Sequence, residues 1–475
     1  MSITEAELFR EIPECITKTD IEGILRAEKN RRDKVVVVLD DDPTGIQTVH
    51  DVYVYTDWSR KALSEAFAEE RCFFIHTNTR ALTKEETAEI NRAIMKNCIL
   101  VSQKTGRDFT VISRGDSTLR GHYPLETSVL REEYEAGTKQ KIHGEVLSPC
   151  FFEGGRYTYK DIHYVKEGGD FIPVGKTEYA GDSVFGFKSS NLREYVEEKT
   201  NGRTKSSEVV SVPLELMRRE DTEGILRILM SVERFGKVVV NAMSYDDLRV
   251  FLVACFTAER DGKRFIYRTA ASFVKAYCMI DDRALLRAED LRGADRGRNT
   301  VLTVVGSHIK KSTDQLDYLL RCEGVRGIEL DVKRVLLDES ARQEEIEKKS
   351  RAVELAFESS LNPVLYTSRK LVRVFGPDNK DNLRIAGTVS EALAEIVKKT
   401  QKKATCIIAK GGTTASDILV KGLGVKKARV TGQVLPGVPL LCLTNIEGRK
   451  QIIYVIYPGN VGDRGSLAEV YETVA

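Results

Sequence analysis

An apolar run that ends in three consecutive aspartates constrains this chain more than any other feature of its sequence. Residues 35–39 are β-branched or aliphatic, which predicts a strand buried on both faces of a sheet. Asp40, Asp41 and Asp42 follow where that strand must end, and a proline and a glycine then favour a turn. Ligands of open parallel sheets bind beyond the carboxyl ends of the strands. We therefore expect a functional site here, although a solvated acidic turn has the same composition.

The same stretch fits a second class of enzyme. The order Asp40-x-Asp42-x-Thr44 after an apolar strand resembles the opening motif of haloacid-dehalogenase-like phosphatases, in which the first aspartate is the nucleophile. A phosphatase that uses Asp40 and Asp42 is therefore an alternative. The later lysine and closing acidic pair of that superfamily are not evident in the sequence, which ranks this alternative second.

Length and charge limit the classes of protein that need consideration. At 475 residues the chain is too long for one ordinary core, so two domains are expected. Its 73 basic and 71 acidic residues give a net charge of +2, which favours neither nucleic acid nor a membrane surface as partner. Nine scattered cysteines without a CxxC pair indicate free thiols and a cytoplasmic protein. Neither the cysteines nor the six histidines form a zinc-binding pattern.

Short apolar strands alternate with helical patterns in both halves of the chain. This alternation predicts an α/β fold of two domains, each a mostly parallel sheet flanked by helices. Expected strands lie at residues 72–76, 109–112, 238–240, 301–305, 405–409, 440–443 and 452–456, and expected helices at residues 84–102 and 214–233. A charged stretch marks the boundary. We predict a first domain at residues 1–285, a linker at 286–299 and a second domain at 300–475.

The first domain carries a turn rich in arginine and hydroxyl groups directly after an expected strand. Arg114 and Arg120 can bind a carboxylate in a two-point manner, and Asp116 and Ser117 can hydrogen-bond the hydroxyls of a sugar-like molecule. Together with Arg80 and the aspartates after residue 39, this turn suits a small polyhydroxy acid. A capped helix start would explain Asp116 or Ser117 but does not require two arginines.

The second domain carries glycine-rich turns after three expected strands. Glycines let backbone N–H groups approach an anion, so these turns are predicted to hold phosphates, and no P-loop motif is present. The turns contain Gly306 and Ser307, then Gly411, Gly412, Thr413 and Thr414, and finally Gly459, Asn460, Gly462 and Asp463. A helix-capping role is the ordinary explanation of one such turn, but three in one domain favour a phosphate site.

The order and spacing of these motifs resemble the four-carbon acid sugar kinase family, whose members phosphorylate threonate, erythronate and 3-oxo-tetronate. The resemblance covers nearly the whole chain and implies a sugar-acid-binding (substrate) domain at residues 1–285 and a nucleotide-binding domain at residues 300–475. It also implies an active site in the cleft between them and ATP with Mg²⁺ as cofactors. It implies that Asp41, Asp42, Arg114, Asp116, Ser117 and Arg120 face the substrate. It likewise implies that Ser307, Gly411, Gly412, Thr414, Gly437, Gly459 and Asn460 lie near ATP.

Three positions depart from the pattern of the family. Thr413 stands where an acidic residue is usual, Tyr457 where a lysine is usual, and Ile309 where a second serine is common. The loss of a cation beside the phosphates would weaken triphosphate binding. Lys310, Lys311 and Lys410 are candidates to supply that charge instead.

The predicted function is phosphorylation by ATP of a hydroxyl on a small, four-carbon-like sugar acid. Asp42 or Asp41 is the predicted base, Arg80 and the Arg114–Arg120 turn the substrate site, and Asp463 a ligand of Mg²⁺. A non-catalytic sugar-acid sensor is a further alternative, supported by Tyr457. The predicted partners are the sugar acid and ATP, with a homodimer as a candidate assembly.

Overall fold

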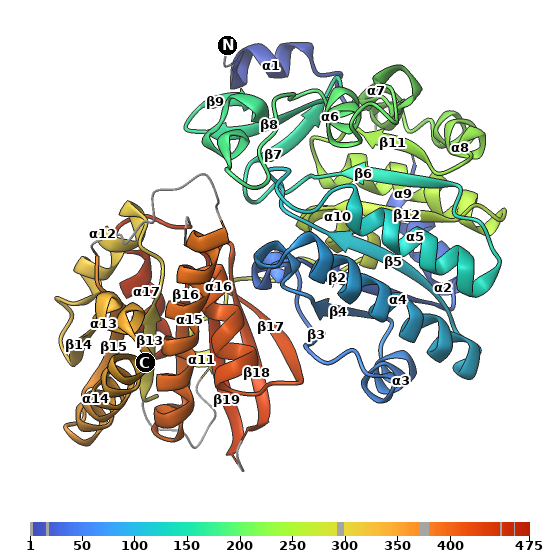
Figure 1. Ribbon diagram of the computed structural model, residues 1–475. Coiled ribbons are helices and arrows are strands. Elements are labelled where there is room, and N and C mark those ends of the chain that lie inside the picture. The colour runs from blue at the N-terminus through green and yellow to red at the C-terminus, as the bar shows by residue number, and fades with distance from the viewer. Residues whose placement is uncertain (1–2, 16–18, 292–298, 370–379, 447–448, 460) are drawn as a thin grey trace. The chain divides into compact units, whose positions relative to one another are not determined.

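The computed structural model describes residues 3–15, 19–291, 299–369, 380–446, 449–459 and 461–475. The chain divides into two compact units, and each consists of two segments of the sequence. The N-terminal unit comprises Met1–Asp41 and Asp57–Asp281, and the C-terminal unit comprises Asp42–Thr56 and Asp282–Ala475 (Figure 1). Half of the linker predicted at residues 286–299, namely residues 292–298, lies outside the described residues. The predicted domain limits stay a prediction.

The N-terminal unit is built on a parallel sheet with the strand order β10-β11-β6-β12-β5-β2-β4. Its strands are β2 (Lys34–Asp40), β4 (Cys72–His76), β5 (Asp108–Arg114), β6 (Gly144–Ser148), β10 (Val210–Val212), β11 (Gly236–Val240) and β12 (Phe265–Thr269). Every pairing within this order is parallel. Val35, Val37 and Val38 are fully buried, as expected for a central strand covered on both faces.

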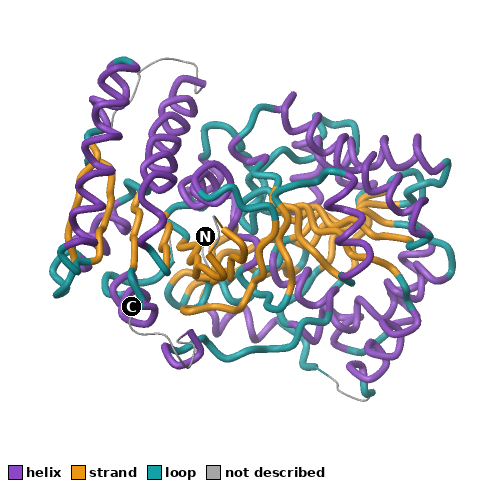
Figure 2. Tube along the Cα trace, turned by 90° about the horizontal axis from the view of Figure 1, so that it is seen from below, coloured by secondary structure: helices purple, strands orange, loops and turns teal. Residues whose placement is uncertain are grey.

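Helices cover both faces of this sheet, as Figure 2 shows. They are α2 (Ile21–Arg31), α3 (Arg60–Glu69), α4 (Lys84–Thr105), α5 (Leu125–Thr138), α6 (Leu192–Lys199), α7 (Leu214–Arg218), α8 (Thr222–Ser231), α9 (Tyr245–Arg260) and α10 (Ala271–Cys278). A capping box of Thr83 and Glu86 begins α4, and Gly106 ends it with φ 72°. The single helix predicted at residues 214–233 is wrong, because Asp221 caps a new helix, α8, after Glu220 turns the chain with φ 53°.

A small antiparallel sheet adjoins the parallel sheet within the N-terminal unit. Its order is β1-β9-β8-β7, with bounds Ile3–Thr4, Asp170–Pro173, Ile162–Glu167 and Arg156–Tyr159, and α1 (Glu5–Glu11) packs on it. Aromatic side chains, including Tyr159, Tyr164 and Phe171, form its core. Short 3₁₀ helices complete the unit at η2 (Thr79–Ala81), η3 (Val174–Lys176), η4 (Glu178–Gly181) and η5 (Ser206–Glu208).

The C-terminal unit contains a mixed sheet with the order β3-β17-β18-β19-β16-β13-β15-β14. The bounds are β3 (Val52–Tyr55), β13 (Val301–Val305), β14 (Val325–Leu330), β15 (Asn362–Thr367), β16 (Cys406–Lys410), β17 (Lys427–Leu435), β18 (Val438–Ile446) and β19 (Arg449–Tyr457). Pairings from β3 to β19 are antiparallel, and those from β19 to β14 are parallel. The parallel half brings the carboxyl ends of β19, β16 and β13 side by side.

The α-helices of this unit are α11 (Ala288–Leu291), α12 (Lys310–Leu319), α13 (Val332–Leu337), α14 (Glu339–Glu358), α15 (Lys380–Thr400), α16 (Gly412–Asp417) and α17 (Ser466–Val474). The unit also contains the 3₁₀ helices η1 (Pro43–Ile46) and η6 (Gln401–Lys403) and a π-helical turn, η7 (Ile418–Gly422). Together the two units confirm the predicted α/β fold of two domains with mostly parallel sheets flanked by helices. Among the described residues, no helix has the length and apolar character required to span a bilayer.

Residues 42–56 leave the N-terminal sheet and join the C-terminal one. Strand β3 pairs antiparallel with β17, with Val54 opposite Ala428. Asp51 forms ion pairs with Arg283 at 2.6 Å and Arg429 at 2.5 Å. The Gln47 side chain donates a hydrogen bond to the carbonyl of Gly437 at 3.2 Å. The last of the three consecutive aspartates therefore belongs to a different unit from the first two.

Candidate functional site

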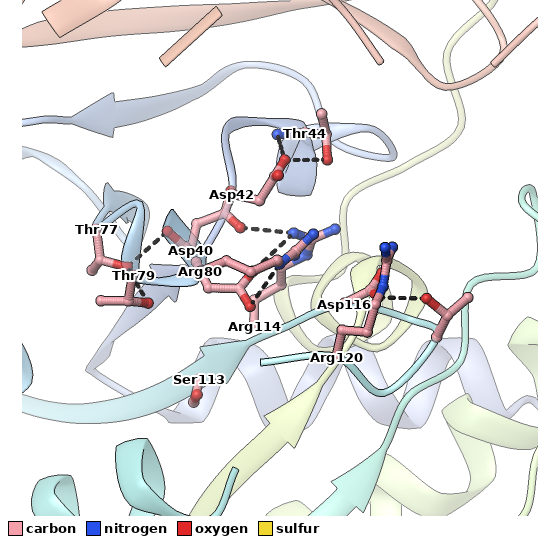
Figure 3. A network of polar contacts seen from close by, with 12 residues as sticks. Asp40, Asp42, Thr44, Thr77, Thr79, Arg80, Ser113, Arg114, Asp116 and Arg120 are labelled. Atoms are coloured by element: carbon pink, nitrogen blue, oxygen red, sulfur yellow. Dashed lines mark hydrogen bonds and ion pairs between the residues drawn. The ribbon is translucent and has the colours of Figure 1, made fainter. Parts of the chain in front are cut away.

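The first two aspartates lie in an ionic network at the carboxyl edge of the N-terminal sheet. Asp40 ends β2 and is the register partner of Arg114, which ends the neighbouring strand β5. Arg114 Nη1 lies 3.0 Å from Asp40 Oδ1 and 3.6 Å from Asp41 Oδ1, and Arg80 Nη2 lies 2.6 Å from Asp41 Oδ1 (Figure 3). Both carboxylates are buried, so these charge-assisted contacts hold them firmly.

The turn after β5 holds a second ion pair. Asp116 Oδ2 accepts hydrogen bonds from Arg120 Nε at 2.7 Å and from the Thr118 hydroxyl (Figure 3). Burial alone would raise the pKa of Asp116, but the guanidiniums of Arg120 and Arg80 and the Thr118 hydroxyl hold that pKa well below its usual range. Asp116 is therefore ionised at neutral pH. The Arg120 guanidinium also lies 5.0 Å from the centre of the Tyr179 ring.

Ser117 is positioned through its backbone by a buried histidine. The Ser117 carbonyl accepts a hydrogen bond from His163 Nε2 at 2.8 Å, and His163 Nδ1 lies 2.9 Å from the Thr158 hydroxyl. Burial lowers the pKa of His163 to about 4, so its imidazole is neutral at physiological pH. His163 therefore holds the turn through its hydrogen bond to the Ser117 carbonyl without adding charge to it.

The sequence prediction missed a fourth arginine, Arg268, which comes from β12. Its Nη1 donates to Ser113 Oγ at 2.9 Å and to Glu126 Oε2 at 2.8 Å, and all three side chains are buried. A Cβ at Gly115 would lie 2.4 Å from the Arg268 guanidinium carbon, and one at Gly121 would lie 2.7 Å from its Nη2. The turn needs these glycines because it passes directly over the guanidinium. A charged residue inside an otherwise apolar strand is the signal that could have revealed it.

We call these eight side chains the arginine–carboxylate cluster: Arg80, Arg114, Arg120, Arg268, Asp40, Asp41, Asp116 and Glu126. Four cations face four anions, so the cluster is close to neutral without a ligand. A small cavity beside it is lined by Asp116, Tyr123, Tyr195, Arg268 and Thr269 among others. The buried Thr269 hydroxyl has no hydrogen-bond partner among the described residues. The volume of this cavity is about 10 Å³, which is room for roughly one water molecule rather than for a whole sugar acid.

The glycine-rich turns of the C-terminal unit meet at the carboxyl ends of β13, β16 and β19. We call Gly306–Ser307, Gly411–Gly412 and Pro458–Gly459 the glycine cradle. The Gly306 amide donates to the carbonyl of Lys410 at 3.2 Å, and the Gly411 amide donates to that of Tyr457 at 2.9 Å. The Ser312 hydroxyl lies 2.9 Å from Ser307 Oγ and 3.1 Å from the Gly459 carbonyl oxygen. The predicted phosphate turns therefore lie together in one unit.

The remaining predicted nucleotide residues differ in their surroundings. Thr414 is buried, whereas Thr413 is exposed on α16. Gly437 turns the chain between β17 and β18 with φ 79°, and its amide donates to Gln433 Oε1 at 2.6 Å. Gly462 has φ 80°, and a Cβ there would lie 2.7 Å from the Tyr457 hydroxyl. Asn460 lies outside the described residues.

Asp42 faces the glycine cradle. Its Oδ1 accepts hydrogen bonds from the Thr44 amide at 2.8 Å and from the Thr44 hydroxyl at 2.5 Å (Figure 3). Its Oδ2 lies 2.9 Å from the position that a Cβ would take at Gly412. A glycine at residue 412 is therefore required for this close approach. Asp42 thus brings one carboxylate oxygen to the phosphate-binding turns.

A cation that the sequence prediction did not identify also reaches the cradle. Arg369, two residues after β15, donates to the Ser307 carbonyl at 2.8 Å and to the Thr367 hydroxyl at 2.6 Å. Burial lowers the pKa of Arg369, which nevertheless stays far above neutral for a guanidinium. Arg369 therefore holds the Gly306–Ser307 turn in place and adds positive charge beside it.

Asp463 acts as a cap where the chain enters α17. Its Oδ1 accepts from the Gly465 amide and from the Ser466 hydroxyl, both at 2.9 Å. The Ser466 hydrogen bond lowers the pKa of this exposed carboxyl group. Across the described part of the chain, no three histidine, cysteine or acidic side chains gather as metal ligands. Magnesium commonly takes only one or two carboxylates and binds substrate phosphates for the rest, so the assignment of Asp463 to magnesium stays a prediction.

We expect Gly306→Ala to destabilise the C-terminal unit, because a Cβ at this position would lie 2.0 Å from the Thr414 hydroxyl oxygen. Overpacking of this kind costs about 1–3 kcal/mol. Thermal unfolding should show a lower melting temperature. Gly387→Ala is the matched control, because nothing lies within 4 Å of the added methyl group and the residue is inside α15. Equal melting temperatures for Gly306→Ala and the wild type would contradict the predicted crowding of the cradle.

Comparisons with known proteins agree with this division of the chain. A family model described as a sugar-binding N-terminal domain matches residues 36–277, and one described as a nucleotide-binding C-terminal domain matches residues 302–467. No curated protein matches the sequence.

Solved structures with the same fold include two bacterial proteins. A putative tRNA synthase from Salmonella typhimurium LT2 is 15% identical, with 93% of this chain and 99% of that chain covered and a TM-score of 0.67. A Haemophilus influenzae protein assigned to the DUF1537 family model is 17% identical, with 92% and 100% covered and a TM-score of 0.58. At these identities the likeness concerns the fold alone.

The two family models, unlike the structural likeness, extend to the sequence itself. Together they match more than half of the chain and follow each other in the order of the two units. The motifs predicted to bind a sugar acid lie within the first match, and the glycine cradle lies within the second. The chain belongs to the four-carbon acid sugar kinase family.

Proposed function

We propose that this protein transfers a phosphoryl group from ATP to a hydroxyl of a small, four-carbon-like sugar acid. One observation carries the proposal beyond family membership. Asp42 directs a carboxylate oxygen at Gly412 of the glycine cradle, while the residue before it, Asp41, belongs to the arginine–carboxylate cluster. A single peptide bond thus joins the predicted sugar-acid site to the predicted phosphate site along the chain.

Of the two candidate bases, Asp42 is better suited than Asp41. Asp41 is buried and bound by Arg80 at 2.6 Å, with Arg114 at 3.6 Å, so its negative charge is already neutralised. Asp42 is half-buried, and its Oδ1 accepts hydrogen bonds from the Thr44 amide and hydroxyl. Its Oδ2 is directed at Gly412 of the glycine cradle, where the phosphates are proposed to bind. Asp42 would therefore take the proton of the attacking hydroxyl.

The arginine–carboxylate cluster would bind the acceptor and the glycine cradle would bind ATP. Arg114 and Arg120 remain the proposed ligands of the substrate carboxylate, with Asp116 and Ser117 toward its hydroxyls. Backbone amides of the cradle and the Ser307 hydroxyl would hold the phosphates. Mg²⁺, when bound, neutralises charge on the phosphates, with Asp463 proposed as its protein ligand. A homodimer and a cytoplasmic location also remain predictions.

The test is ADP release with ATP and Mg²⁺ against a panel of stereoisomeric four-carbon sugar acids. Turnover that depends on one sugar acid is the expected result and would identify the substrate. Sugar-acid binding without any ATP binding would instead favour a sensor. Release of phosphate from a sugar phosphate without nucleotide would favour the phosphatase, which would have to use Asp40 although this carboxylate is buried against Arg114.

A further inference from the structure

One lysine next to the glycine cradle is buried, and among the described residues its ammonium forms no ion pair with a carboxylate. Lys410 is the last residue of β16 and is fully buried. Its Nζ donates a hydrogen bond to the Pro458 carbonyl at 3.2 Å and lies 4.0 Å from the centre of the Tyr457 ring. Tyr457 is also its register partner on β19. Among the described residues, no acidic side chain lies within ion-pair distance of this ammonium.

Other buried lysines of the chain show how unusual this is. Lys237 also lies against an aromatic ring, that of Phe235, but it forms an ion pair with Glu145 at 2.6 Å. Lys263 is buried and pairs with Glu233 at 2.5 Å. A buried ammonium without a counter-charge destabilises a fold, and an anionic ligand beside it would offset that cost.

The charges around Lys410 agree with an anionic ligand. Burial, and to a smaller extent the neighbouring ammonium of Lys311 at the start of α12, lower the pKa of Lys410 to about 7. Asp42 beside Gly412 and Asp463 after β19 are the carboxylates of this region, and neither raises this pKa. Lys311 and Lys310 are exposed, so of the three candidate lysines only Lys410 lies inside the cradle.

We propose that Lys410 is the cation that binds the phosphate chain of the nucleotide and that it takes up a proton when the nucleotide binds. The inference rests on the proposed function, which assigns the glycine cradle to ATP. Tyr457 is paired with Lys410 across the β16–β19 pair, so its ring borders the ammonium. The aromatic face then stabilises the ammonium next to the phosphates.

The sign of the pH dependence follows from the lowered pKa. Between pH 7 and about 10 the unfolded chain holds a proton on this lysine that the ligand-free fold has released. The stability of the ligand-free protein should therefore rise with pH over this window. Nucleotide binding needs the protonated form, so the affinity for nucleotide should fall as pH rises above 7.

The experiment is calorimetric titration of the full-length protein with a non-hydrolysable ATP analogue and Mg²⁺ at pH 8, in two buffers of different ionisation enthalpy. The wild type should take up close to one proton per nucleotide. Lys410→Met should bind the analogue at least about tenfold more weakly and without proton uptake. Without nucleotide, Lys410→Met should melt at the same or a higher temperature, because folding no longer requires this side chain to give up its proton.

Two control variants separate this role from a structural one. Lys311→Met removes the exposed neighbouring charge and should retain the proton uptake. Lys237→Met should lower the melting temperature, because it leaves Glu145 buried and unpaired. Unchanged affinity and proton uptake in Lys410→Met would overturn the inference and leave the kinase proposal standing. A wild type that binds neither the analogue nor inorganic triphosphate would overturn both. Lys410-dependent binding without turnover on any sugar acid would overturn the kinase proposal alone.

Discussion

Asp42→Asn should lower kcat by about 10²–10⁴-fold, the range that a positioned general base contributes. The substitution keeps the size and the hydrogen bonds of the side chain, since an amide oxygen can still accept from the Thr44 amide and hydroxyl. It removes the carboxylate that faces Gly412 of the cradle. The measurement is steady-state ADP release with the sugar acid that the panel identifies.

The binding constants distinguish a base from a metal ligand. If Asp42 is the base, Asp42→Asn should bind the Mg²⁺ complex of an ATP analogue with nearly wild-type affinity. If Asp42 also holds the metal, that affinity should fall together with kcat. Asp51→Asn is a matched control in the same segment, because Asp51 pairs with Arg283 and Arg429 and lies outside the proposed site. Turnover of Asp42→Asn close to that of Asp51→Asn would rule out the base assignment.

The parts of the fold that the sequence predicts well are those whose hydrophobic pattern is local. The valine run of β2 and the strands before the glycine cradle are apolar on both faces, so their type and position follow from sequence alone. The end of each strand is marked by glycine or aspartate. The cradle could be predicted for this reason, because parallel neighbouring strands bring such ends to one edge.

The features that the prediction missed depend on contacts between distant residues. Nothing in residues 42–56 indicates that β3 pairs with β17, because that pairing joins segments more than 370 residues apart. The break between α7 and α8 depends on one cap, at Asp221, inside a stretch with continuous helical periodicity. The small sheet of β1 and β7–β9 is formed by short strands around aromatic residues, which lack a clear alternating pattern.

In the candidate site, too, the residues that sequence predicts are marked by a local pattern, and the residues that it misses depend on contacts between distant segments. The arginines of the turn after β5 are visible because they follow a strand end, whereas Arg268 lies within β12 and is identified only by its contact with Glu126. The role proposed for Lys410 likewise depends on burial and on the absence of a nearby carboxylate among the described residues. Sequence indicates which side chains are charged, but pairing decides which of these charges a ligand must balance.

Arg268→Met should destabilise the N-terminal unit by about 3–5 kcal/mol, the cost of breaking a buried ion pair at one partner. Arg268 and Glu126 lie 2.8 Å apart with both side chains less than a tenth exposed, so the substitution leaves Glu126 charged in a dry environment. It also removes the donor to Ser113 Oγ. Chemical denaturation followed by circular dichroism measures the change.

Two further variants decide whether the pair, rather than the volume of the side chain, accounts for the loss. Arg92→Met removes the arginine of a partly exposed pair with Glu133, at 2.9 Å, and should cost no more than about 1 kcal/mol. Adding Glu126→Gln to Arg268→Met removes the stranded charge and should restore part of the lost stability. If the double variant is as unstable as the sum of the single ones, Arg268 and Glu126 are not coupled. The Arg268 guanidinium would then stabilise the turn only through its hydrogen bond to Ser113 and its packing against Gly115 and Gly121. The ion pair between Arg268 and Glu126 would not contribute to the stability of the arginine–carboxylate cluster.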